Sequence, residues 1–430
     1  MSQPIPGLTG GNDSVKVGYG FWHGNLVGSD TVDFTQNAAF TLTGGSGNDK
    51  IISTSQSASI KLGNGNDTIH GGTGDATVEL GNGRDSVHFV DGQFKIVLGS
   101  GNDTVDITTG AVTVVAGGGN DKIHVRSGTD FVHVGSGNDT IFLDRHGART
   151  LVAGSGHDSI TGQSGTYSVH VGNGNDTIEL ESGTATLIGG SGRDKVTVDD
   201  GSAVIRLGNG NDTVALSSGH YVVTLGNGKD SLSVNAGSGF ISVGNGHDTL
   251  HVEDFIGKVL AGNGPDSIIA TDDSALVKSG AGKDTIFASG GVTVDAGRGN
   301  DKLVFKSNAH GNMTATGGPG HDTFQYNYLD GPENGAAKNL HIGKVVITDF
   351  SRKADTLAFH DPDNDGLNQS QVNAHATVTD GGLHHKVMIV IHTTGNAAAG
   401  TIVLKGIGTS HHVLTSIDAL VTHGYNLTFS

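Results

Sequence analysis

The sequence predicts an all-β fold: a right-handed parallel β-roll, or β-solenoid, with two sheets and ion-binding turns along one edge, followed by a β-rich C-terminal cap. The pentapeptide Gly-x-Gly-x-Asp occurs sixteen times in the 430 residues, and nearly every copy follows the last by 18 residues. A fixed period of this size is typical of a coil that stacks identical turns. The aspartates should therefore form a column down one edge.

Each repeat also predicts two short strands. An aliphatic or aromatic residue stands two positions after every one of the sixteen aspartates, as Ile69 and Val87 do. Apolar residues then alternate before the next turn, as at Ile60 and Leu62, which is the pattern of a half-buried strand. The reverse turn between the two strands, for example at Ser127, has no matching aspartate. We therefore expect ions on one edge only.

The column of carboxylates predicts bound cations. Adjacent rungs of a parallel stack lie about 4.8 Å apart, and like charges at that distance repel. Carboxylate and backbone carbonyl oxygens in a flexible glycine turn suit Ca²⁺, and nothing in the repeats resembles the Cys/His set that zinc prefers. We predict multiple Ca²⁺ ions, on the order of fifteen, with one ion between neighbouring rungs.

The predicted metal-site residues in these turns are the two glycines and the aspartate of each copy. They are Gly45, Gly47, Asp49, Gly63, Gly65, Asp67, Gly81, Gly83, Asp85, Gly99, Gly101, Asp103, Gly117, Gly119, Asp121, Gly135, Gly137, Asp139, Gly154, Gly156, Asp158, Gly172, Gly174, Asp176, Gly190, Gly192, Asp194, Gly208, Gly210, Asp212, Gly226, Gly228, Asp230, Gly244, Gly246, Asp248, Gly262, Gly264, Asp266, Gly280, Gly282, Asp284, Gly297, Gly299, Asp301, Gly318, Gly320 and Asp322.

The repeated motif resembles the RTX nonapeptide, GGxGxDxUx, of which two copies per turn build a calcium-loaded parallel β-roll. The resemblance covers about residues 9–330. Here the first glycine is usually replaced by a strand residue, such as Leu62 or Val134, and only every second nonapeptide keeps the ion turn. This one-sided version is similar to the calcium-stacked rolls of some bacterial RTX adhesins.

The repeat divides the chain into three predicted regions. Residues 1–43 hold degenerate rungs, in which Asp13 and Asp30 keep an Asp-Ser/Thr-Val core without the leading glycine. Residues 44–330 form the calcium β-roll, and residues 331–430 a C-terminal cap. Within the cap, residues 344–359 resemble the segment that closes many RTX rolls. That resemblance implies an uncleaved signal for type I export from a Gram-negative cell.

Composition bounds the partners and the folding mechanism. The chain has 43 acidic and 25 basic residues and a formal net charge of −18, which disfavours nucleic acid as a partner. With 72 glycines and one tryptophan, the apolar core offers little against the entropy of ordering the chain. We expect the chain to be largely unfolded without metal and folded with it. Filling about fifteen sites would move the net charge to roughly +12.

Two further features of the composition concern location. The chain has no cysteine, which fits either a reducing compartment or an exported protein stabilised by ions in place of disulfides. No segment reaches 18 consecutive apolar residues, so no membrane span is predicted.

The C-terminal region carries one more candidate metal site. Asp361, Asp363 and Asp365 reproduce the first half of an EF-hand-type calcium loop, although Val372 stands where the last carboxylate is expected. A calcium site and a solvated acidic turn both remain open there. The histidines at 384, 385, 392, 411 and 412 have no fixed zinc spacing and are interpreted as surface residues.

No catalytic motif is found, so we predict that the protein is not an enzyme. The leading hypothesis is a secreted structural or adhesive calcium-binding protein of a cell-surface layer, biofilm matrix or assembling rod, which folds on binding calcium outside the cell. Its expected partners are further copies of itself, in a lattice or filament, and an anionic cell-surface polysaccharide. The alternatives are an ice-binding protein and a secreted calcium-binding carrier that does not assemble.

Overall fold

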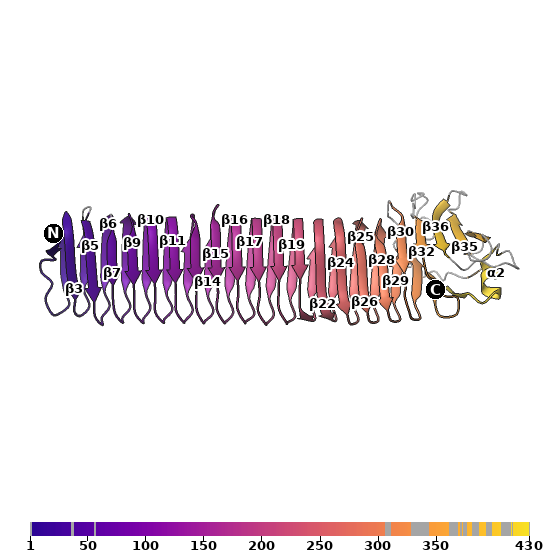
Figure 1. Cartoon of the computed structure of the whole chain (residues 1–430), viewed down its shortest axis with the longest axis horizontal. Coiled ribbons are helices and arrows are strands. Elements are labelled where there is room, and N and C mark those ends of the chain that lie inside the picture. The colour runs from indigo at the N-terminus through magenta and orange to yellow at the C-terminus, as the bar shows by residue number, and fades with distance from the viewer. Residues whose placement is uncertain are drawn as a thin grey trace, which may run out of the picture. The chain divides into compact units, whose positions relative to one another are not determined.

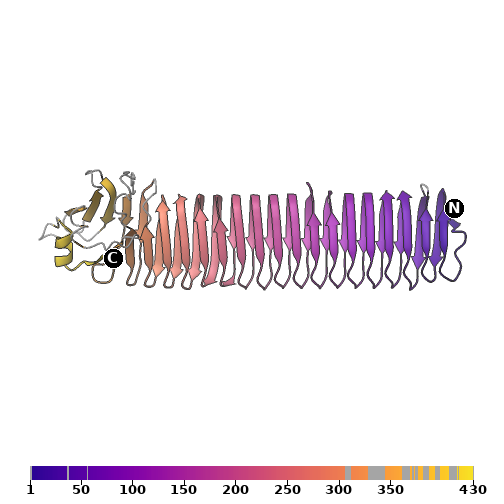
Figure 2. The same ribbon diagram turned by 180° about the vertical axis from the view of Figure 1, so that it is seen from behind.

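The computed structural model describes residues 2–35, 38–55, 57–305, 311–327, 344–360, 369, 372, 376–380, 387–392, 398–405, 414 and 416–429. The chain divides into two compact units, residues 1–209 (unit 1) and residues 210–430 (unit 2), which we describe one at a time. Each unit is built mainly of stacked turns of a β-solenoid, which we call rungs. Figures 1 and 2 show the rungs of each unit from two opposite sides.

Unit 1 consists of strands that pair in parallel with the strands one rung before and one rung after. They are β1 (Gln3–Pro4), β2 (Ser14–Val17), β3 (Gly20–Leu26), β4 (Thr31–Phe34), β5 (Ala38–Gly44), β6 (Lys50–Ser55), β7 (Ala58–Lys61), β8 (Thr68–Thr73), β9 (Ala76–Glu79), β10 (Ser86–Val97), β11 (Thr104–Val115), β12 (Lys122–Val125), β13 (Asp130–His133), β14 (Thr140–Leu143), β15 (Ala148–Val152), β16 (Ser159–His170), β17 (Thr177–Ile188) and β18 (Lys195–Arg206).

The strands of each rung fall into two sheets. The post-aspartate sheet contains the strand that follows each aspartate, where Val87 pairs with Ile69 and Val105. The pre-aspartate sheet contains the strand that leads into the next aspartate turn, where Ile96 pairs with Val114. The 12-residue strands, such as β10, run through the opposite turn without a break. The aspartate turns are the row of thin loops along one edge in Figure 1.

Unit 2 repeats this plan. Its strands are β19 (Thr213–Thr224), β20 (Asn227–Gly228), β21 (Ser231–Val234), β22 (Gly237–Gly246), β23 (Thr249–Glu253), β24 (Phe255–Asn263), β25 (Ser267–Asp273), β26 (Leu276–Ala281), β27 (Thr285–Gly290), β28 (Thr293–Arg298), β29 (Lys302–Phe305), β30 (Met313–Thr316), β31 (Thr323–Asn327), β32 (Lys344–Ile347), β33 (Thr356–His360), β34 (Ala376–Asp380), β35 (Val387–His392), β36 (Ala398–Leu404) and β37 (Asn426–Phe429).

The last strands of unit 2 lie in the C-terminal region that the sequence predicts to be rich in β-structure. Strands β36 and β37 continue the two sheets in parallel, against β32 and β33 respectively. Strand β35 then pairs antiparallel with both β34 and β36. Helix α2 (Ile417–Thr422) begins at Ser416, whose hydroxyl accepts a hydrogen bond from the Ala419 N–H, a favourable N-cap.

Alternating side chains place the core between the two sheets of each unit. In unit 1, Ile123, Val132 and Ile141 are fully buried, and the residues between them along the strands face solvent to a greater degree. In the first rungs, Phe34 and Phe40 stack in the core with ring centroids 3.8 Å apart. Because the apolar layer between the sheets is thin, it buries little area per residue. Interactions in the turns must therefore contribute to the stability of the stack. No helix among the described residues is long and apolar enough to cross a membrane.

Candidate metal centre

Glycine is required in the aspartate turn because the rungs approach each other closely there. Gly137 has φ +144°, and a Cβ at this position would overlap the carbonyl oxygen of Gly119, one rung earlier. In unit 2, Gly264 has φ +127° and would overlap the carbonyl oxygen of Gly246 in the same way. Only glycine combines this backbone conformation with the absence of a side chain. The turns therefore bring backbone carbonyl oxygens and aspartates of adjacent rungs together.

One carboxylate oxygen of each aspartate is used to connect rungs. In unit 1 the N–H of Asp103 donates to Oδ1 of Asp121 at 2.8 Å, and the N–H of Asp121 donates to Oδ1 of Asp139 at 2.7 Å. In unit 2 the N–H of Asp248 donates to Oδ1 of Asp266 at 2.9 Å. The same bond recurs from rung to rung, so within each unit the aspartates form the predicted column.

The second carboxylate oxygen is buried and has no hydrogen-bond partner. In unit 1 this holds for Oδ2 of Asp67, Asp85, Asp103, Asp121, Asp139, Asp158 and Asp176, and in unit 2 for Oδ2 of Asp230, Asp248, Asp266, Asp284, Asp301 and Asp322. Buried polar atoms without partners are rare in proteins and strongly destabilising when charged. A row of such oxygens at one edge fits the binding of hard cations, which take oxygen donors.

The donor set fits Ca²⁺. Among the described residues no three His, Cys, Asp or Glu side chains gather closely enough to hold an ion by themselves. An ion beside Oδ2 would therefore draw its remaining ligands from the backbone carbonyl oxygens of the glycine turns and from water, as calcium sites commonly do. The residues present thus fit a mixed site of carboxylate and carbonyl oxygens for this ion.

Burial changes the protonation of the column. Burial, together with the neighbouring carboxylates, raises the pKa of Asp85, Asp139, Asp266 and Asp301 to about 7. The pKa of Asp67 is raised to about 6, also mainly by burial. Backbone N–H groups lower these values but do not offset the burial. Since burial disfavours the ionised form, a bound cation is what would keep the column ionised.

The column extends beyond the sixteen predicted turns at both ends. In unit 1, Oδ1 of Asp30 accepts from the Asp13 N–H at 2.7 Å and Oδ2 accepts from the Val27 N–H at 2.9 Å. In unit 2, Asp355 follows Asp322, whose N–H donates to Oδ1 of Asp355 at 3.1 Å, and Oδ2 of Asp355 accepts from the Ser351 N–H at 2.8 Å.

Sequence reasoning did not include these two aspartates among the site residues, although both stand in an Asp-Thr-aliphatic sequence that could have identified them. They differ from the aspartates named above, whose Oδ2 has no partner, because both of their carboxylate oxygens accept from backbone N–H groups. Asp30 and Asp355 are therefore stabilised without an ion, whereas the aspartates with an unpartnered Oδ2 are not.

The opposite turn of the rung is built differently. It also needs glycine, since Gly110 has φ +120° and a Cβ there would overlap the carbonyl oxygen of Gly92. Asp130 lies near this edge, but its Oδ2 accepts from Nε of Arg149 at 3.1 Å. Among the described residues, the buried carboxylate oxygens without partners belong only to the aspartate turns.

Several predicted residues lie outside the described part of the chain. Asp361, Asp363 and Asp365 of the expected C-terminal calcium loop are among them, as are the histidines at 384, 385, 411 and 412. These predictions stay predictions.

Comparison with known families agrees with this geometry. The family described as RTX calcium-binding nonapeptide repeat (4 copies) matches residues 41–56, 59–92, 108–141, 150–178, 181–214, 188–223 and 260–292. Every matched stretch consists of rungs of the solenoid. No curated protein matches the chain significantly.

Proposed function

This chain is built from RTX calcium-binding nonapeptide repeats, and we propose that it is a secreted structural or adhesive protein that folds on binding calcium outside the cell. Proteins with such repeats are generally extracellular and exported by type I secretion. The observation that carries the proposal is the row of buried, unpartnered Oδ2 atoms. Such a row makes the folded state unfavourable at neutral pH until cations arrive. A chain of this kind can be exported unfolded and then ordered by extracellular calcium. Calcium sites in extracellular modules typically have dissociation constants near the millimolar range.

The number of ions is part of the proposal. One ion between each pair of neighbouring inner aspartates gives about fifteen per chain, with none expected at Asp30 or Asp355 because their oxygens are already satisfied. Native mass spectrometry of the full chain in calcium measures this directly. A ratio of one or two ions per chain would contradict it.

Folding by calcium is tested by circular dichroism of the full chain, first in EGTA and then during titration with Ca²⁺. We expect a largely disordered spectrum that converts to a β spectrum, and a weaker response to Mg²⁺, which demands a smaller and more regular site. A cooperative thermal transition in EGTA, equal to that in calcium, would overturn the proposal.

The adhesive part of the proposal is supported by charge. Loading with about fifteen Ca²⁺ would change the net charge from −18 to roughly +12, which favours anionic surfaces and polysaccharides. Analytical ultracentrifugation in millimolar calcium, with and without an acidic polysaccharide such as polygalacturonate, separates the outcomes. Self-association or co-sedimentation supports a lattice or adhesive role, and a persistent monomer that binds neither supports the carrier role.

Ice binding is a second candidate because asparagines form a regular row beside the aspartates. The N–H of Asn66 donates to Oδ1 of Asn48 at 2.7 Å, and the N–H of Asn138 to Oδ1 of Asn120 at 2.8 Å. Arg84 and Arg193 interrupt this row with long charged side chains. A thermal hysteresis measurement decides between the candidates, and we expect no freezing-point gap.

A further inference from the structure

We propose that unit 1 binds an extended, neutral glycan chain in a shallow trough on the outer face of its pre-aspartate sheet. This inference rests on the proposed adhesive function and adds to it a second ligand class, a neutral glycan bound at a defined surface, besides the anionic partners that the net charge favours. The trough is separate from the aspartate turns and uses none of their residues.

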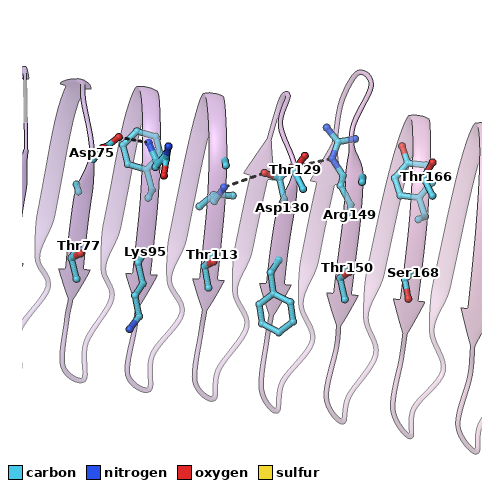
Figure 3. A pocket seen from close by; sticks show the side chains of 18 of the residues that line it. Asp75, Thr77, Lys95, Thr113, Thr129, Asp130, Arg149, Thr150, Thr166 and Ser168 are labelled. Atoms are coloured by element: carbon cyan, nitrogen blue, oxygen red, sulfur yellow. Dashed lines mark hydrogen bonds and ion pairs between the residues drawn. The ribbon is translucent and has the colours of Figure 1, made fainter.

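The trough is long and narrow in outline. It has a volume of about 890 Å³ and is lined by three adjacent positions in successive rungs, from Ser57 to Thr186 (Figure 3). Eight rungs contribute to the lining, which corresponds to about 34 Å along the stacking direction at about 4.8 Å per rung. A ligand that fills such a trough must be an extended chain lying across the strands.

Hydroxyl groups follow one side of the trough in register. Thr77, Thr113, Thr150, Ser168 and Thr186 occupy the same position of different rungs. Figure 3 shows the first four of them in one row on the strands. Each hydroxyl can donate one hydrogen bond and accept two. A row of such groups suits a polymer that itself presents hydroxyls at regular intervals.

Charge along the trough is balanced. Lys95 lies in the hydroxyl row and Asp75 on the other side of the trough. Oδ1 of Asp75 accepts a hydrogen bond from the Gln93 N–H at 2.9 Å. With one formal charge of each sign at its exposed rim, the trough favours neither a polyanion nor a polycation. This chemistry favours a neutral glycan.

An aromatic side chain interrupts the row of hydroxyls. Phe131 pairs with Thr113 on one side and Thr150 on the other, and it is 39% exposed. The exposed part of Phe131 is apolar surface in water, and covering it with a ligand is favourable in proportion to the area buried. The apolar face of a sugar ring is a suitable partner for an aromatic side chain, because burying apolar area against the ring is favourable.

The charged residues beneath the trough are not available for catalysis. The side chains of Asp130 and Arg149 are fully buried and joined at 3.1 Å, and the two terminal nitrogens of Arg149 donate to the carbonyl oxygens of Arg145 and Asp144 at 2.6 and 2.5 Å. Glycoside hydrolysis requires two carboxyl groups free to act on the sugar. The trough therefore binds a glycan without cleaving it.

Calorimetric titration of the full, calcium-loaded chain tests the inference. The probes are the neutral oligosaccharides cellohexaose, xylohexaose and laminarihexaose, with hexagalacturonate as the anionic comparator. We expect at least one neutral probe to bind, Phe131→Ala to weaken its affinity about tenfold, as the loss of an aromatic anchor does, and Thr113→Arg to abolish binding by filling the trough. Unchanged reducing-end titre after incubation is expected.

Phe240→Ala is the matched control. Phe240 occupies the same position of a rung in unit 2, eight residues before its aspartate, and its removal should leave affinity unchanged. The proposal fails if no neutral probe binds, if only hexagalacturonate binds, or if Phe131→Ala and Phe240→Ala have equal effects. Circular dichroism and calcium stoichiometry of each variant are measured in parallel, so that failure of this site is distinguished from failure of calcium-dependent folding.

Discussion

The two turns of each rung have the same backbone requirement but opposite electrostatics. Both need glycine, since a Cβ at Gly137 or at Gly110 would overlap the carbonyl oxygen of the preceding rung. At the aspartate turn the rungs are joined by carboxylates that keep one oxygen unpartnered, as at Asp121. Near the opposite turn, the buried charges in the described part of the chain are Asp130 and Arg149, which neutralise each other. Glycine thus marks close stacking, and aspartate marks the need for an ion.

A change of pH should have the largest effect that distinguishes the two turns, because many buried aspartates of the aspartate turns titrate together. In the metal-free roll, burial raises the pKa of Asp85 and Asp139 to about 7, above about 3.9 in an unfolded chain. A raised pKa in the folded state contributes stability below the unfolded value that is lost as pH rises through the folded value. The metal-free roll should therefore become less stable from about pH 4 to 7.

Calcium reverses that dependence, because Ca²⁺ binds the ionised carboxylate and protons compete with it. We expect the calcium concentration at the folding midpoint to stay nearly constant between pH 8 and 6, where the unfolded chain and the loaded roll are both ionised, and to rise only toward the unfolded carboxylate pKa of about 3.9. Circular dichroism at pH 4.5, 6 and 8, in EGTA and in calcium, measures both trends. Parallel trends in the two conditions would show that the aspartates do not hold the ion.

Breaking the buried ion pair near the opposite turn should have the next largest effect. Arg149→Met leaves the carboxylate of Asp130 buried without its partner, which costs about 3–5 kcal/mol of stability. Replacing both residues, as Asp130→Val with Arg149→Met, should recover most of the loss. The measurement is denaturant unfolding in saturating calcium. The number of bound ions should not change, and a loss of ions in Arg149→Met would mean that the two edges are coupled.

A single substitution in the inner column should have a smaller effect on overall stability but a specific effect on metal. Asp121→Asn retains an oxygen for the Asp103 N–H but removes the charge that an ion needs, so we expect one or two fewer ions and a loss of about 1–3 kcal/mol. The control is Asp91→Asn, which changes an exposed aspartate at the opposite turn. Native mass spectrometry compares their ion counts, and equal counts would contradict the assignment.

Most of this architecture could be predicted from the sequence because the same motif occurs sixteen times at a nearly constant spacing. The position of Asp67 and the strand at Ile69 follow from periodicity alone, and the structure has both where they were expected. The ends were harder to predict because the period fails there. Asp355 lies 33 residues after Asp322, yet it accepts the hydrogen bond that continues the column. An 18-residue period does not predict a spacing of this length.

Two other features depend on contacts that the one-dimensional pattern does not contain. Oδ1 of Asp121 accepts a hydrogen bond from the Asp103 N–H of the neighbouring rung, which leaves only Oδ2 for an ion. The sequence motif indicated the ion but not this hydrogen bond. Asp130 and Arg149 stand 19 residues apart and are ordinary polar residues in the sequence, yet they occupy a core column. Only the register of two adjacent rungs shows that they meet.

The hydrogen bond from each aspartate N–H to the carboxylate of the next rung affects how the number of repeats can change during evolution. Within a unit, the hydrogen bonds of the aspartate column join each rung to the next one and have the same form. Deleting residues 104–121 would place the N–H of Asp103 opposite the carboxylate of Asp139. Recombination between repeats can therefore lengthen or shorten the aspartate column by whole rungs. The deletion of residues 104–121 would also remove Asp106, so Arg126 would lose its ion-pair partner.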